Sequence, residues 1–147
     1  MPERDLALLT DAAREAGRIA LRFWRRDPKV RDKGGEHGPV TEADLAVNDM
    51  LKARLLAARP DYGWLSEETP DDAARLGCET VFIIDPIDGT RAFIAGEETF
   101  AHSLAVAHRG EVTAAVVFLP ALDVIYTASQ FSAPLKDGQA IQASRRD

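Results

Sequence analysis

The chain has 147 residues, 46% hydrophobic and 29% charged, which are the proportions of one ordinary globular domain. Lys and Arg number 18 against 24 Asp and Glu, which gives a net charge of −6. The sequence also has no basic block that could follow a nucleic-acid backbone. The single cysteine, Cys78, excludes a disulfide framework, and no run approaches the roughly 20 apolar residues of a membrane span. We therefore expect a cytoplasmic protein that binds neither nucleic acid nor membrane.

Two helices are predicted near the start of the chain. Apolar residues recur at intervals of three and four over residues 5–26, which indicates a helix with one buried stripe. A second helix is predicted over residues 42–59, where Thr41 and Asp44 resemble a capping box. Between the helices we expect a short strand at residues 29–31, followed by a mobile loop rich in glycine.

After the second helix, the pattern changes to short apolar runs separated by turn residues. The expected strands lie at residues 62–65, 81–84, 100–107, 112–119, 124–128 and 140–143. Residues 130–134 are interpreted as a connection and residues 135–139 as a turn. The sequence therefore predicts an α+β fold, in which two N-terminal helices pack on one face of a largely antiparallel sheet of about six strands.

The most informative segment places Asp85 and Asp88 directly after a buried apolar run. Carboxylates without a basic neighbour suit Mg²⁺, which prefers oxygen ligands. Gly89 would let a phosphate approach the backbone, and the amides of Gly89 and Thr90 would point at an anion if a short helix begins there. Aspartate, proline and glycine also make common turns, so this segment alone leaves a turn and a metal site equally open.

Two other aspartate motifs fail on spacing. Phosphatases of the haloacid dehalogenase type need a nucleophilic aspartate two residues before Asp88, where this chain has Ile87. A calcium loop needs oxygen ligands at alternate positions, and Pro86 and Ile87 supply none from their side chains. Glu67 and Asp44 add further carboxylates, although each by itself also fits a solvated acidic stretch or a helix cap.

Three segments in this order closely resemble the inositol monophosphatase family of Mg²⁺-dependent phosphatases: residues 40–44, 65–68 and 84–93. The resemblance extends over essentially the whole chain from the first helix. It implies a phosphomonoester hydrolase in which a metal-activated water attacks a small phosphate. Inositol monophosphate is the first substrate it suggests, with histidinol phosphate or a 3'(2'),5'-bisphosphate nucleotide as alternatives. Two or three Mg²⁺ ions are expected in the complete site, and Mn²⁺ can replace them.

The resemblance also assigns metal ligands. Glu67, Asp85 and the backbone carbonyl of Ile87 would bind one Mg²⁺, and Asp85 and Asp88 would bind a second. Lys33, in the loop rich in glycine, would lie near the metal site.

The remaining assignments concern the water and the phosphate. Thr90, with Glu67 or Asp44, would orient and deprotonate the attacking water. The Thr90 hydroxyl is too weakly acidic to lose its proton and act as the base itself, so it would relay a proton or position the water. Asp88, Gly89 and Thr90 would bind the phosphate.

Residues 1–147 are expected to form a single domain like the N-terminal metal-binding domain of this family, and we expect its C-terminal α/β domain to be absent. That domain supplies a tryptophan-aspartate motif, whereas Trp24 and Trp64 are followed here by Arg25 and Leu65. The alternative function is therefore a truncated, catalytically impaired domain that acts through association or not at all. We expect a homo-oligomer, or association through a surface that the second domain would cover. The histidines, including His102, are interpreted as surface or satisfied strand positions.

Overall fold

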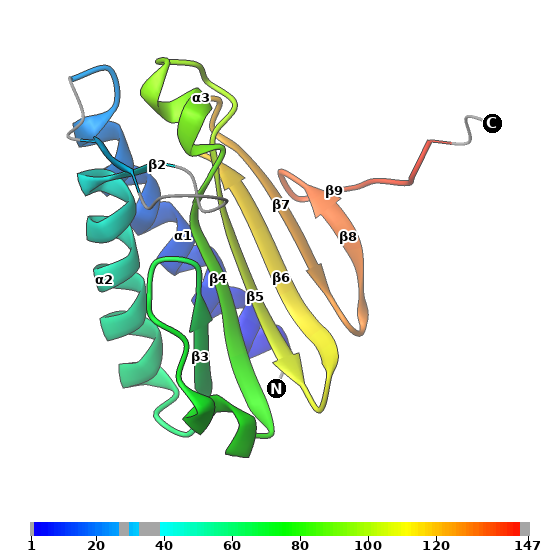
Figure 1. The fold of residues 1–147 in the computed structure, drawn as a ribbon. Helices are drawn as coiled ribbons and strands as arrows, with labels where there is room; N and C mark the ends of the chain where they lie inside the picture. The colour runs from blue at the N-terminus through cyan, green and yellow to red at the C-terminus, as the bar shows by residue number, and fades with distance from the viewer. Residues whose placement is uncertain (1, 27–29, 33–38, 145–147) are drawn as a thin grey trace.

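The computed structural model describes residues 2–26, 30–32 and 39–144 (Figure 1). Lys33, for which a place near the metal site is expected, lies outside these residues. The two predicted helices are present as α1 (Pro2–Phe23) and α2 (Glu42–Ala58). No helix in these ranges is both long enough and apolar enough to span a membrane.

The strands form one large sheet and one small one. Their bounds are β1 (Val30–Asp32), β2 (Pro39–Thr41), β3 (Gly63–Ser66), β4 (Thr80–Asp88), β5 (Ala101–His108), β6 (Glu111–Leu119), β7 (Val124–Ser129), β8 (Ser132–Lys136) and β9 (Gln139–Ala140). The large sheet has seven strands in the order β3-β4-β5-β6-β7-β8-β9, and β1 pairs only with β2. Because β3 and β4 are parallel and the other pairs are antiparallel, the predicted α+β fold with a largely antiparallel sheet is confirmed.

The end of the sheet differs from the prediction. Residues 132–136 form β8, so their interpretation as a connection and a turn is wrong. The strand predicted at residues 140–143 is limited to β9, after which the chain leaves the sheet (Figure 1). Nearly every residue of β8 is exposed, so an edge strand of this kind has no apolar alternation to reveal it. Asp137 and Gly138 have φ values of 50° and 83°, as in the tight turn that commonly joins two strands.

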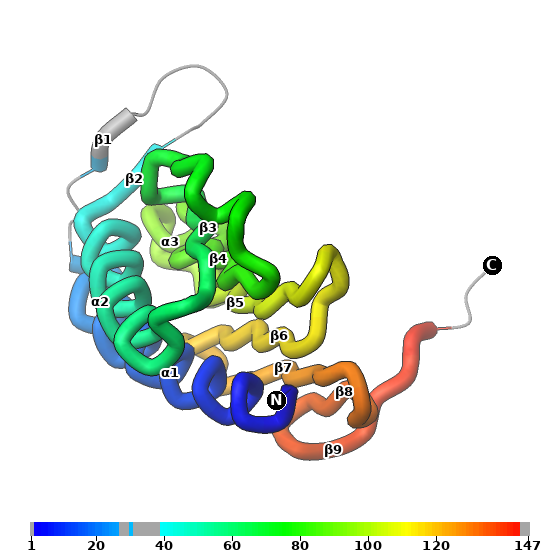
Figure 2. Tube along the Cα trace, turned by 90° about the horizontal axis from the view of Figure 1, so that it is seen from below, coloured from blue at the N-terminus to red at the C-terminus, as the bar shows by residue number. Residues whose placement is uncertain are grey.

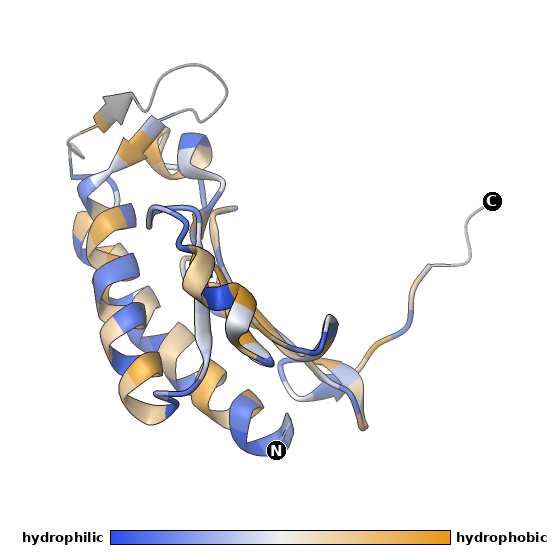
Figure 3. Cartoon of the chain, turned by 60° about the horizontal axis from the view of Figure 1, so that its bottom comes forward, coloured by the Kyte–Doolittle hydropathy of each residue, from blue (hydrophilic) through white to orange (hydrophobic). Residues whose placement is uncertain are grey.

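Both long helices pack on one face of the large sheet, as the view from below shows (Figure 2). Every second residue of the central strands points toward them and is buried: Phe82, Ile84, Leu104, Val106 and Val116. Small residues of α1 allow a close approach, since a Cβ on Gly17 would lie 2.6 Å from the ring of Phe118. Neither α1 nor α2 lies on the opposite face (Figure 3), and Ile83 and Tyr126 on it are 39% and 36% exposed.

Candidate active site

The start of α2 fixes one carboxylate of the site. Thr41 Oγ1 accepts a hydrogen bond from the Asp44 amide at 3.2 Å, and Asp44 Oδ2 accepts one from the Thr41 amide at 2.9 Å. This reciprocal pair is the predicted capping box. It leaves Asp44 Oδ1 to accept a hydrogen bond from Thr90 Oγ1 at 2.9 Å, although 46 residues separate the two in sequence. The cap therefore aims a buried carboxylate at the Thr90 hydroxyl.

The second part of the site is a bulge at the end of β4. Asp85 pairs with Ser103 and Asp88 with Ala101, so β4 has one residue more than β5 over this stretch. Gly89 follows with φ 82°, and a short helix, α3 (Thr90–Ile94), begins directly after it. Thr90 Oγ1 also lies 3.2 Å from the Ile87 carbonyl oxygen. The bulge therefore brings the Ile87 carbonyl to the hydroxyl that bonds to Asp44.

Three other carboxylates, those of Glu67, Asp88 and Asp44, lie near Asp85 in a loose cluster. Parallel pairing sets Ser66 of β3 opposite Ile84, and the Glu67 amide donates to the Ile84 carbonyl at 3.3 Å, so Glu67 lies beside Asp85. Burial of Asp85, the negative charges of Glu67 and Asp88, and a hydrogen bond with Glu67 raise the pKa of Asp85 to about 7. Both Glu67 and Asp85 border a hollow of about 410 Å³ on the sheet face opposite α1 and α2.

The donors in this cluster fit a hard divalent cation. Asp85 Oδ1 is buried and accepts no hydrogen bond, which is costly for an ionised oxygen. Its neighbours are carboxylates, whose oxygens are ligands that Mg²⁺ and Ca²⁺ take. Among residues 2–26, 30–32 and 39–144, however, no three His, Cys, Asp or Glu side chains converge closely enough to hold a metal ion. The oxygen donors are therefore of the type that binds Mg²⁺, but they are not as close together as the ligands of a bound ion.

The structure also identifies a residue that the sequence reasoning missed. Asn48 lies one helical turn after Asp44 and is buried. Its Oδ1 accepts a hydrogen bond from Ser66 Oγ at 2.5 Å, and its Nδ2 donates to Thr69 Oγ1 at 2.9 Å. These bonds tie α2 to both ends of the turn that carries Glu67. Polar residues four apart on the buried face of α2 were the available signal.

The histidines differ from one another. His108 is exposed at the end of β5, and its Nδ1 lies 2.7 Å from Thr80 Oγ1, as expected of a satisfied strand position. His102 lies in β5 but is fully buried, and its Nε2 has no hydrogen-bond partner. The interpretation of His102 as a surface or satisfied position is therefore wrong.

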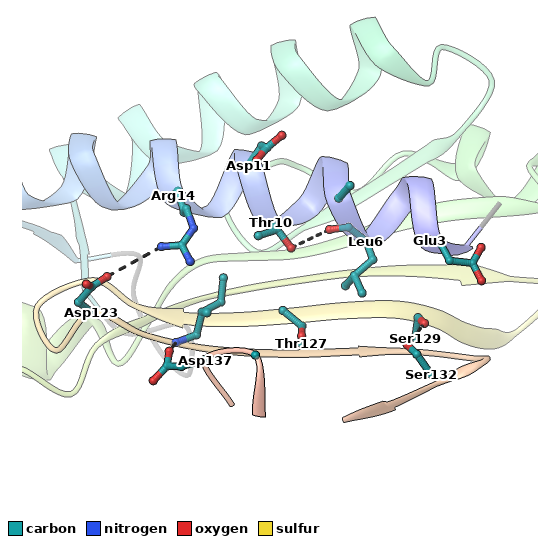
Figure 4. A pocket seen from close by; sticks show the side chains of 13 residues that line it. Glu3, Leu6, Thr10, Asp11, Arg14, Asp123, Thr127, Ser129, Ser132 and Asp137 are labelled. Carbon is teal, nitrogen blue, oxygen red and sulfur yellow. Dashed lines mark hydrogen bonds and ion pairs between the residues drawn. The ribbon is translucent and has the colours of Figure 1, made fainter. Parts of the chain in front are cut away.

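A wider hollow of about 770 Å³ lies between α1 and the strands β7 and β8 (Figure 4). An ion pair between Arg14 and Asp123, 3.9 Å long, lies at one end of it. Residues predicted to bind metal, water or phosphate do not line this hollow. The described residues with predicted roles therefore lie around the end of β4 and not at this hollow.

Comparison with known proteins shows which family the chain resembles. Residues 1–147 match the sequence profile of the inositol monophosphatase family. The chain is 34% identical to a histidinol-phosphatase of Chlorobaculum parvum over 95% of its own length and 53% of the relative's. It is 32% identical to an inositol-1-monophosphatase of Mesorhizobium japonicum over 96% of its length and 53% of the relative's. The crystal structure of extragenic suppressor protein suhB from Bartonella henselae matches with a TM-score of 0.90 and 30% identity, over 97% of this chain and 55% of that one. The chain thus spans about half the length of these relatives.

Proposed function

The chain belongs to the inositol monophosphatase family, and we propose that it functions in the Mg²⁺-dependent hydrolysis of a small phosphate monoester. The observation that carries this proposal is the unpartnered Asp85 Oδ1, which lies among carboxylates next to the Thr90–Asp44 hydrogen bond. Inositol monophosphate is the first substrate we propose, with histidinol phosphate or a 3'(2'),5'-bisphosphate nucleotide as alternatives. Relatives named histidinol-phosphatase and inositol-1-monophosphatase match this chain at similar identity, so the choice between these two substrates needs an assay.

The proposed metal ligands are the oxygens around the bulge. Glu67, Asp85 and the Ile87 carbonyl would hold one Mg²⁺, and Asp85 with Asp88 would hold a second. Bound Mg²⁺ supplies positive charge to the phosphate and lowers the pKa of a bound water. The residues themselves set the position of that charge, because the strand bulge and the parallel β3–β4 pairing bring Glu67 and Asp85 together. Mn²⁺, which takes the same oxygen ligands, is expected to replace Mg²⁺.

Activation of the water would rest on Thr90 and Asp44. When the Thr90 hydroxyl donates to Asp44 Oδ1, its oxygen remains able to accept a proton from a water molecule. A proton could then pass from that water to Thr90 as the Thr90 proton passes to Asp44. The 2.9 Å hydrogen bond supports Asp44, more than Glu67, as the partner of Thr90 in this step. Thr41 keeps Asp44 oriented through the capping box.

The phosphate would bind at Asp88, Gly89 and Thr90. Gly89 has no side chain and holds a φ of 82°, which most other residues would adopt only with strain. The first amides of a helix have no partner within that helix, so those at the start of α3 are available to an anion. This part of the proposal supplies a place for the phosphate beside the metal ligands.

The test is phosphate release by the purified chain from inositol 1-phosphate, histidinol phosphate and a 3',5'-bisphosphate nucleotide, with and without Mg²⁺. We expect Mg²⁺-dependent release that falls at least about 100-fold in Asp85→Asn, as for loss of a metal ligand. Asp71→Asn is the matched control, because Asp71 is exposed and forms an ion pair with Arg75 at the surface. Release that is unchanged by Asp85→Asn would rule out the proposed site.

One observation favours the second function, a noncatalytic domain that associates. The sheet face opposite α1 and α2 exposes Ile83 and Tyr126, and exposed apolar surface tends to mark an interface. Because the chain spans about half of its relatives, turnover by the chain alone is itself part of the test. Absence of phosphate release from all three substrates, together with dimers or larger species in light scattering, would favour association between copies of this chain.

A further inference from the structure

His102 is a buried polar residue at the centre of the fold. It lies on β5, between β4 and β6, on the face that the helices cover, and its side chain has no exposed area. The rings of Phe100 and Phe118 lie 6.5 Å and 6.4 Å from the imidazole, centroid to centroid. Burial lowers the pKa of His102 to about 4, so the ring is neutral at physiological pH. An apolar side chain would suit these surroundings better than an imidazole does.

The imidazole makes one hydrogen bond within the described residues. Its Nδ1 lies 2.5 Å from the carbonyl oxygen of Pro86, and its Nε2 has no partner. A carbonyl only accepts, and a neutral imidazole carries one N–H, so the proton must be on Nδ1. The Nε2 acceptor is then left buried and unpaired, at a cost that the bond to Pro86 has to offset.

Pro86 is the residue at which the strand pairing is interrupted. The register passes from Asp85↔Ser103 to Asp88↔Ala101, so Pro86 and Ile87 together lie opposite His102. Pro86 has no N–H with which to pair, and a bulge leaves its extra residue outside the ladder. The His102 ring thus donates a hydrogen bond to a carbonyl at the point where the strand register shifts.

We propose that His102 is a positioning residue, which fixes the Pro86 carbonyl and thereby sets the directions of Asp85, the Ile87 carbonyl and Asp88. Pro86 stands between Asp85 and Ile87, so a rotation of its peptide plane turns the groups on either side. The consequence for Mg²⁺ affinity rests on the proposed function, whereas the hydrogen bond and its effect on the bulge do not. Residues that orient metal ligands without binding the metal themselves commonly contribute 10-fold to 100-fold to metal affinity.

Two substitutions separate the hydrogen bond from packing. His102→Phe keeps a ring but has no donor, and His102→Asn loses volume but keeps an N–H near the position of Nδ1. Val106→Ala is the control, because Val106 is buried on the same strand and face but pairs with Phe82, away from the bulge. Amide hydrogen exchange at residues 87 and 88 in metal-free protein reports on the bulge. Isothermal titration with MgCl₂ reports on metal affinity, and ¹⁵N resonances of His102 in the unmodified chain report on its tautomer.

We expect the Nδ1–H tautomer, exchange about tenfold faster in His102→Phe as for loss of one hydrogen bond, and Mg²⁺ affinity at least about 10-fold weaker. His102→Asn should recover most of both, and Val106→Ala should change neither. An Nε2–H tautomer overturns the proposal, even if a variant does not fold. So does a His102→Phe variant with unchanged exchange, or an Asn variant no better than the Phe variant. If the unmodified chain binds no Mg²⁺ while exchange follows the expected pattern, the proposed function fails and the positioning role stands.

Discussion

Asp85→Asn should make the metal-free protein more stable at pH 8, although it removes a proposed ligand of Mg²⁺. The pKa of Asp85 rises from 3.8 to about 7 in the folded chain because of burial and the charges of Glu67 and Asp88. A folded-state pKa above the unfolded value means that the stabilising contribution of protonated Asp85 is complete below about pH 4 and is lost as pH rises through 7. An asparagine does not ionise, so it avoids this loss.

The magnitude follows from the pKa difference. About 1.4 kcal/mol per pH unit would give about 4 kcal/mol over this range. Asp85 is only partly buried, so solvent screening reduces the effect, and we expect about 2 kcal/mol. The assay is urea unfolding followed by tryptophan fluorescence, in EDTA, at pH 4 and pH 8. The variant should exceed the parent at pH 8 by about 2 kcal/mol and match it more closely at pH 4.

Two further measurements test whether the charge of Asp85 causes this pH dependence. Asp71→Asn should show the opposite dependence, because Arg75 lowers the pKa of Asp71. Adding MgCl₂ should raise the unfolding free energy of the parent, by about 2.7 kcal/mol at 100 times its Kd, and leave Asp85→Asn unchanged. An Asp85→Asn variant whose stability relative to the parent is the same at both pH values would refute the account of Asp85 as a strained carboxylate.

Three other substitutions test separate parts of the structure. Thr90→Val should lower kcat at least about 100-fold with little change in KM, measured by phosphate release, because it removes the hydroxyl that bonds to Asp44; a kcat within twofold of the parent contradicts the proton relay. Asn48→Leu should lower the unfolding free energy in urea by about 1–3 kcal/mol, since Ser66 and Thr69 lose a buried partner. Gly17→Ala should lower thermal stability by on the order of 1 kcal/mol, because crowding against Phe118 outweighs the better helix propensity; a higher melting temperature would show that Phe118 moves aside freely.

Much of the fold was predictable because it depends on local pattern. The periodicity of α1 and α2 and the apolar runs of β4 to β7 each reflect neighbours within a few residues. The capping box between Thr41 and Asp44 is also local, and its prediction is confirmed. The exposed strand β8 was missed because no face of it is buried, and the Asp137–Gly138 turn was its best signal.

By itself, the sequence determined which residue types stand near the proposed site and in what order, since the motif around Asp85 and Asp88 is contiguous. Only the tertiary structure decided which of them meet. Asp44 reaches Thr90 across 46 residues, Asn48 reaches Ser66, and His102 reaches Pro86 at a bulge that no period of the sequence marks. These contacts depend on strand register and on how α2 packs against the sheet, and both are set by burial of the whole core rather than by any one segment.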